Sequence, residues 1–221
     1  MQHRLVAGSL RPAPVVLLIA GAWLLLAALV LSGHGGAIRH DRLLQGGPPL
    51  WLAAVGFAAG WQVMVWAMMA PASLHALQGA GAQFVGGYVA VWTAFGLAIF
   101  FADAGLHYGV AHWSWLAERA WLIPGATLAF CGTYQLSNLK ARSLEACLIP
   151  SRSGLRHGLD CVGSSGGLML LSFALAAASL AAMAAITVAM VFEISPWGRS
   201  SVRLLGYGLV AAGVAAIAVG A

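Results

Sequence analysis

Charged residues are scarce in this chain. Only 8% of its 221 residues are charged, whereas 61% are hydrophobic. A soluble domain has about 25% charged residues, because its water-exposed surface must be covered by polar groups. The deficit excludes a water-soluble globule and predicts an integral membrane protein whose solvent is the lipid bilayer.

Several motifs that carry chemistry are also missing. The three cysteines, Cys131, Cys147 and Cys161, form no CxxC pair, and an odd number fits no disulfide framework. The chain contains no Walker A loop, HExxH, GxSxG or CxxCH motif. Asp103 and Glu193 are expected near helix ends, whereas proton-coupled pumps place ionisable groups within the bilayer. We therefore expect neither an enzyme nor a self-energised transporter.

The net charge of +5 comes from basic residues spread along the chain, and it does not indicate a nucleic-acid partner. Basic residues in membrane loops mainly set orientation, because cytoplasmic loops carry the excess. Four of them fall between residues 137 and 160, and Arg4 and Arg11 precede the first apolar run. This bias predicts a bacterial inner-membrane protein with both termini in the cytoplasm.

Six apolar stretches predict the architecture, which is an all-α, polytopic membrane helix bundle in one domain. The expected transmembrane helices lie near residues 13–31, 50–70, 84–102, 120–136, 165–192 and 204–221. The fourth is short and contains Pro124, so it is tilted, broken or re-entrant if it does not span. The imidazoles expected on the outer side are those of His34, His40, His107 and His112.

Residues 61–71 carry three of the seven methionines. Met64 and Met68 share one helix face, Met69 lies about 100° away, and His75 joins the face if the helix continues through the proline. Thioethers are soft ligands that suit Cu(I), and an imidazole can complete such a site. The alternative is that these methionines only fill gaps in an apolar core.

A second group of sulfur residues follows in the expected helix over 165–192. Met169, Met183 and Met190 fall within roughly 60° of one another on an ideal helix, and Cys161 lies near the same edge. Close packing is again the alternative, since Cys161 alone is also typical of a small buried hydrophobe. Before this group, Lys140 follows the end of the fourth helix, where we expect it to meet lipid phosphate.

Together these elements resemble a bacterial family of predicted metal-binding integral membrane proteins. The matching elements are Trp61 with Met64 to Pro71, Tyr134-Gln135-Leu136 with Leu139-Lys140, and Cys161-Val162-Gly163 with Leu168-Met169-Leu170. The family continues Cys-Val-Gly with two further cysteines, where this chain has Ser164 and Ser165. It also has two cysteines after the lysine, where this chain has Ser143 and then Cys147. The resemblance implies metal binding by a partly degenerate ligand set.

We therefore expect a non-catalytic protein that binds or handles a soft metal, with copper as the ion. The candidate ligands are Met64, Met68, Met69, Cys147, Cys161 and Met169, with His75 as a further candidate. The ion would be passed to a membrane protein partner or shared in a homo-oligomer. The alternative is a metal-free accessory subunit of a larger membrane complex. A small-solute transporter ranks last, because few polar residues line any helix.

Overall fold

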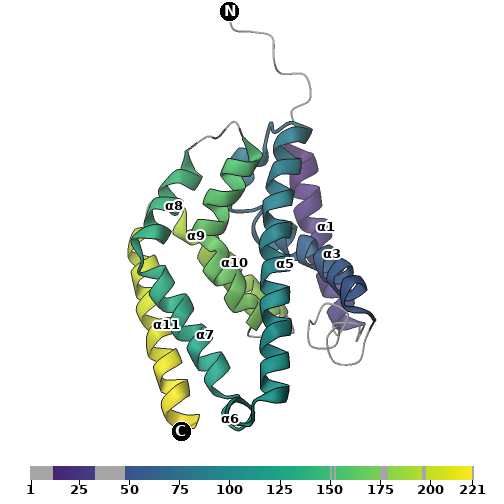
Figure 1. The fold of residues 1–221 in the computed structure, drawn as a ribbon. Helices are drawn as coiled ribbons and strands as arrows, with labels where there is room; N and C mark the ends of the chain where they lie inside the picture. The colour runs from purple at the N-terminus through teal and green to yellow at the C-terminus, as the bar shows by residue number, and fades with distance from the viewer. Residues whose placement is uncertain are drawn as a thin grey trace, which may run out of the picture.

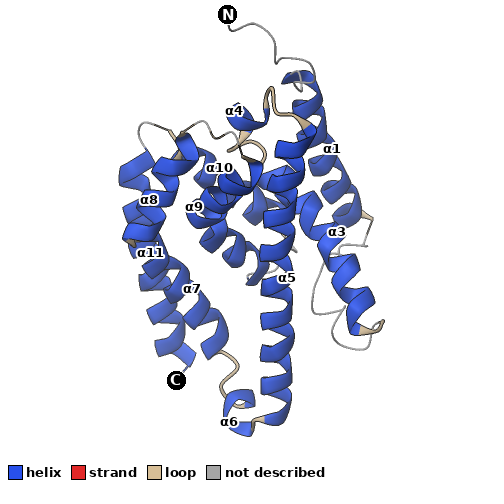
Figure 2. Cartoon of the chain, turned by 45° about the horizontal axis from the view of Figure 1, so that its top comes forward, coloured by secondary structure: helices blue, strands red, loops and turns tan. Residues whose placement is uncertain are grey.

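The computed structural model describes residues 12–32, 48–149, 151, 153–174, 179–195 and 198–220, and within them the regular structure is entirely helical (Figures 1 and 2). The helices are α1 (Pro12–Leu31), α3 (Leu50–Met68), α4 (Leu74–Leu77), α5 (Ala82–His112), α6 (Ser114–Ala117), α7 (Leu122–Gln135), α8 (Asn138–Leu148), α9 (Gly154–Ala174), α10 (Leu180–Glu193) and α11 (Gly198–Gly220). The expected all-α class is confirmed.

Local sequence explains where several helices begin. Pro49 precedes α3 with φ −51° and ψ 145°, an extended geometry that suits a helix start. The Ser137 side chain accepts a hydrogen bond from the Lys140 backbone amide at 3.2 Å and caps α8. The Ser179 side chain accepts one from the Ala182 amide at 3.3 Å and caps α10 in the same way. Such caps satisfy amides that have no partner inside the helix.

Four helices in the described ranges are long and apolar enough to cross a membrane, judged by length and composition. They are 14–31, 50–68, 82–112 and 200–220. The helices α7 and α10 have 14 residues each, and a span needs about 20. The expected number of about six spans therefore stays a prediction.

The arrangement places α9 at the centre. The 31-residue helix α5 runs along the molecule, with α1 and α3 on one side and α7 and α11 on the other (Figure 1). The helix α9 packs against α5, α7, α8 and α10, while α7 pairs with α11. A Cβ atom at Gly132 or Gly213 would come within 2.6 Å of the partner backbone, so this α7–α11 contact depends on glycine.

The structure corrects three expectations about the chain. The single helix expected over 165–192 is instead α9 and α10, because Ser179 caps a new helix where the alanine-rich sequence favours continuation. Asp103 lies inside α5 and not at its end, since that helix continues to His112. The basic segment 137–160, which was expected to be a loop, contains the whole of α8 and the start of α9. Some earlier expectations lie outside the described residues, namely those on Arg4, Arg11, His34, His40 and Arg152.

Candidate metal centre

The sulfur-bearing side chains gather in the core. All three cysteines and six of the seven methionines belong to one buried cluster, and the seventh, Met1, lies outside the described residues. These six methionines are at most 4% exposed. The ligand candidates Met64, Met68, Met69, Cys147, Cys161 and Met169 are all in this cluster. Their burial fits an internal soft-metal site, and it also fits simple core packing.

Two thiols meet where α8 packs on α9. Cys147 of α8 and Cys161 of α9 are both buried where these two helices pack, and neither forms a disulfide. The neighbouring Cys161 thiol and burial raise the pKa of the Cys147 thiol. Close approach of α8 to α9 depends on Gly163, since a Cβ atom there would collide with Ser143. The two cysteines are 14 positions apart in sequence, so packing of the two helices brings them together.

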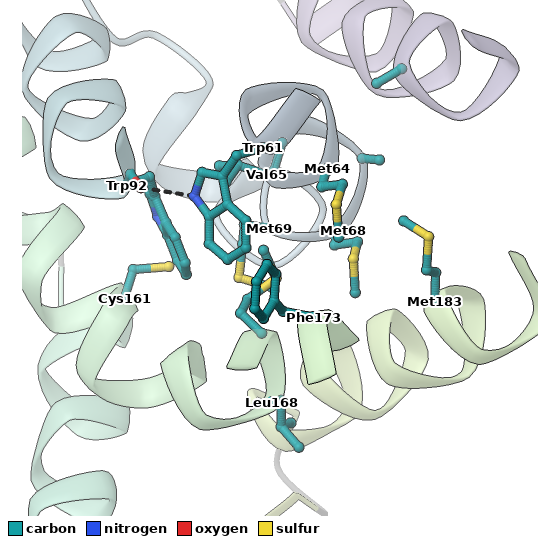
Figure 3. Packing of buried hydrophobic residues seen from close by; sticks show 14 of the residues in the cluster. Trp61, Met64, Val65, Met68, Met69, Trp92, Cys161, Leu168, Phe173 and Met183 are labelled. Atoms are coloured by element: carbon teal, nitrogen blue, oxygen red, sulfur yellow. Dashed lines mark hydrogen bonds between the residues drawn. The ribbon is translucent and has the colours of Figure 1, made fainter. Parts of the chain in front are cut away.

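Hydroxyl groups from the neighbouring helices surround the Cys161 sulfur. Ser73 Oγ lies 3.5 Å from Cys161 Sγ, and Tyr88 OH lies 3.8 Å from it. The two hydroxyls are 3.4 Å apart, so the three groups form one buried network. The indole of Trp92 lies beside Cys161 (Figure 3). Hydroxyl groups this close to a sulfur atom are able to donate to a thiolate, which is the form in which cysteine binds a metal.

His75 does not extend the methionine face of α3. The helix ends at Met68, three residues before Pro71, which has no amide hydrogen with which to continue the ladder. His75 then lies on the short helix α4, where its side chain is exposed. The condition for its alignment with Met64 and Met68 is therefore not met. Its ring instead faces that of His157, with the centroids 6.1 Å apart.

The methionines of α3, Met64 and Met68, lie away from Cys161 (Figure 3). Figure 3 shows Met183 of α10 pointing toward the side of α3 that carries Met64 and Met68. In the same view Cys161 lies on the other side of Trp61, whose Nε1 donates to the Trp92 carbonyl at 2.8 Å. The core therefore holds a thioether group between α3 and α10 and a thiol group between α8 and α9.

A buried ion pair next to the thiols was missed by the sequence analysis. Lys140 is fully buried, and its Nζ lies 2.6 Å from Glu193 Oε2 and donates to the Ser164 carbonyl. Gln135 Nε2 donates to Glu193 Oε1 at 2.6 Å. The expectation that Lys140 meets lipid phosphate is wrong, because its side chain points from the first turn of α8 into the core and contacts α9. Burial lowers the pKa of Lys140, and Glu193 opposes that shift.

The donor set fits copper by its chemistry. Thiols and thioethers are soft ligands that favour Cu(I) over hard cations such as Mg²⁺. In the part of the chain that the structure describes, no three His, Cys, Asp or Glu side chains come together as a metal cluster. A closed site of the structural-zinc kind is thus not formed by these residues. Cys147 and Cys161 provide two sulfur ligands, a number that Cu(I) accepts.

Comparison with known proteins supports this chemistry. The family model described as "PpoB2: Copper chaperone" matches residues 58–216, which include every candidate ligand. No curated protein and no solved structure matches the chain. The expected resemblance to a metal-related family is confirmed. Since the match spans well over half of the 221 residues, this chain belongs to the PpoB2 copper chaperone family.

Proposed function

We propose that this protein binds Cu(I) as cargo through Cys147 and Cys161 inside a membrane helix bundle and passes the ion to a partner protein. The observation that carries the proposal is the burial of these two thiols where α8 packs on α9, in a copper chaperone family. Thiolates bind Cu(I) tightly, yet ligand exchange lets the ion leave to another sulfur site. Such a role needs no catalytic residue, and we propose none.

The membrane setting is part of the proposal. Four helices have the length and apolar composition of transmembrane spans, and the charged fraction is low. We place the protein in the inner membrane of a bacterium with the basic segment 137–160 in the cytoplasm. In Figure 1 the start of α1 lies at the same end of the bundle as α8, whereas α11 ends at the opposite end, so we place only the N-terminal side of α1 in the cytoplasm as well. The helices α8 and α9 then hold the thiols close to the cytoplasmic side. The receiving partner is another membrane protein or a second copy of this chain.

The methionines Met64, Met68, Met69 and Met169 are proposed as secondary ligands. Their thioethers keep soft donors within the same core after the ion leaves the thiols. Met183 of α10 adds a further thioether beside Met64 and Met68 (Figure 3). Thioethers carry no charge, so they hold Cu(I) more weakly than thiolates and suit passage better than storage.

The test is copper stoichiometry of the purified protein in lipid nanodiscs, measured by mass spectrometry during titration with Cu(I) against a chelator. We expect tight binding in the natural protein and its loss in Cys147→Ser/Cys161→Ser. The matched control is Cys131→Ser, which changes a buried thiol that donates to the Gly167 carbonyl at 3.2 Å. Met64→Leu/Met68→Leu should bind copper more weakly while keeping the core volume.

A Cu(I) affinity in the double serine variant equal to that of the natural protein would overturn the assignment of the thiol pair. No copper in the natural protein, together with a stable complex with another membrane protein, would instead support the metal-free accessory subunit.

A further inference from the structure

His157 is buried without a hydrogen-bond partner. It lies in the first turn of α9 and is 1% exposed, and neither of its ring nitrogens has a partner among the described residues. An unsatisfied buried polar group costs about 1–3 kcal/mol, so a core that needed only packing would place an apolar ring here. The imidazole therefore needs another explanation.

The aromatic rings around His157 extend from the surface of the protein to its buried core. Its ring stacks on Tyr88 with the centroids 5.9 Å apart and lies 5.6 Å from Phe84, both on α5. On another side it meets the ring of His75, 6.1 Å away and nearly perpendicular. His75 is exposed on α4. One imidazole of this pair thus faces the outside of the molecule, and the other faces the interior.

His157 and Cys161 occupy the same side of α9. They are four residues apart, a spacing that puts two side chains one above the other on a helix. Tyr88 contacts both, since its ring stacks on His157 and its hydroxyl lies 3.8 Å from Cys161 Sγ. Metal-binding side chains therefore follow one another from the exposed ring of His75 to the thiols of Cys161 and Cys147.

These groups form successive pairs and not one closed site. In the described ranges, no three side chains of His, Cys, Asp or Glu are placed to hold one ion together. A storage site would bring its ligands to one point, whereas a transfer path needs neighbouring ligands that take the ion in turn. The imidazoles are also weaker donors for Cu(I) than thiolates, which favours onward movement to sulfur.

We propose that His75 and His157 form an imidazole pair through which Cu(I) moves between the surface of the protein and the thiols Cys161 and Cys147. The inference rests on the proposed function, because it assumes that the thiols are the binding site. In the inward step a copper–nitrogen bond to His157 breaks as a copper–sulfur bond to Cys161 forms. The thiol proton moves to the vacated imidazole nitrogen, and the ion stays Cu(I), so no oxidant or reductant is needed.

The first experiment measures the rate of loading. Full-length protein in nanodiscs is mixed with the Cu(I)–bicinchoninate complex, and loss of the complex is followed by stopped-flow absorbance. We expect His157→Phe and His75→Gln to load at least about tenfold more slowly, with unchanged final stoichiometry. The phenylalanine keeps the ring packing against Tyr88 and Phe84, and the His75 change is at an exposed position. The control is His112→Gln, an exposed imidazole at the end of α5.

The second experiment identifies the ligands by X-ray absorption of bound copper. In Cys147→Ser/Cys161→Ser the ion should stop at the imidazoles, with nitrogen ligands only, and adding His157→Phe should remove it. Loading rates within about twofold of the natural protein in both histidine variants would overturn the path, even with copper bound by sulfur. A natural protein that binds no Cu(I) would instead defeat the proposed function itself.

Discussion

The helices α1 and α9 are nearly equal in length, at 20 and 21 residues, yet their surfaces are opposite in character. Apolar side chains cover the outside of α1, where Leu17 is 70% exposed and Leu24 is 71% exposed. Thirteen residues of α9 are buried, and they include His157, Cys161 and Ser164. In water the polar helix would lie outside. The reversal follows if the solvent is the lipid that we propose, and it places the candidate chemistry on one of the less apolar helices.

The largest effect is expected from the ion pair between Glu193 of α10 and Lys140 of α8. Glu193→Gln leaves Lys140 charged and buried without its counter-ion, and this should lower the free energy of unfolding by about 3–5 kcal/mol. Lys140→Met/Glu193→Leu removes both charges and should recover most of that loss. The measurement is equilibrium unfolding in mixed micelles, with Glu118→Gln at an exposed position as the control. A double variant no more stable than Glu193→Gln would show that the pair itself is not the cause.

The next largest effect on the free energy of unfolding is expected at a buried leucine, and an exposed leucine provides the comparison. Leu168 of α9 is 1% exposed, and Leu168→Ala should cost about 2–5 kcal/mol because it opens a cavity in the core. Leu17→Ala on α1 removes the same atoms from an exposed position, so the same unfolding measurement should give a change below about 0.5 kcal/mol. Equal losses in the two variants would mean that α1 is covered by another surface, and the contrast between the helices would fail.

A smaller effect is expected where α11 meets α7. Gly213→Ala places a methyl group 2.6 Å from the Ala129 amide nitrogen and should destabilise the protein by about 1–3 kcal/mol through overpacking. Gly208→Ala on the same helix meets nothing within 4 Å, so it should be neutral or slightly stabilising. The measurement is the free energy of unfolding of the two variants under the same conditions. A stable Gly213→Ala would show that the two helices separate without cost.

The smallest effect is expected from the addition of a metal ligand to α9. Ser164 is 2% exposed and its hydroxyl donates to the Cys161 carbonyl at 2.9 Å, so Ser164→Cys puts a third thiol beside the pair. We expect Cu(I) affinity to rise by about tenfold, or about 1.4 kcal/mol, in chelator competition. Cys131→Ser, at a thiol on α7, should leave the affinity unchanged. If Cys131→Ser weakens binding as much as Ser164→Cys strengthens it, the ligands lie elsewhere in the core.

Much of the fold follows from hydrophobic runs. The expected helix over 50–70 corresponds to Leu50–Met68, since both are defined by prolines that start and stop the helix. The break between α9 and α10 could not be predicted in the same way. Alanine, leucine and methionine are good helix formers, and a single serine inside such a run gives a weak stop signal. Helix ends at such positions depend on packing with the neighbouring helices.

The candidate site was predicted only where the ligand type is visible in the sequence. Cysteine and methionine are recognisable as soft donors, so Cys147 and Cys161 could be named without a structure. Lys140 and Glu193 are 53 positions apart, and only the packing of α8 and α10 around α9 reveals that they pair. His157 lies in a segment that its polarity marks as a loop, although its distance of four residues from Cys161 was a usable signal.

The two thiols of the pair lie on helices of unequal length. Cys161 belongs to the central 21-residue helix α9, whereas Cys147 is on the 11-residue helix α8. The separation of the sulfur atoms is therefore set by how α8 rests on its neighbour. A movement of α8 away from α9 would separate the two sulfur ligands and release an ion, with no movement of the long helices.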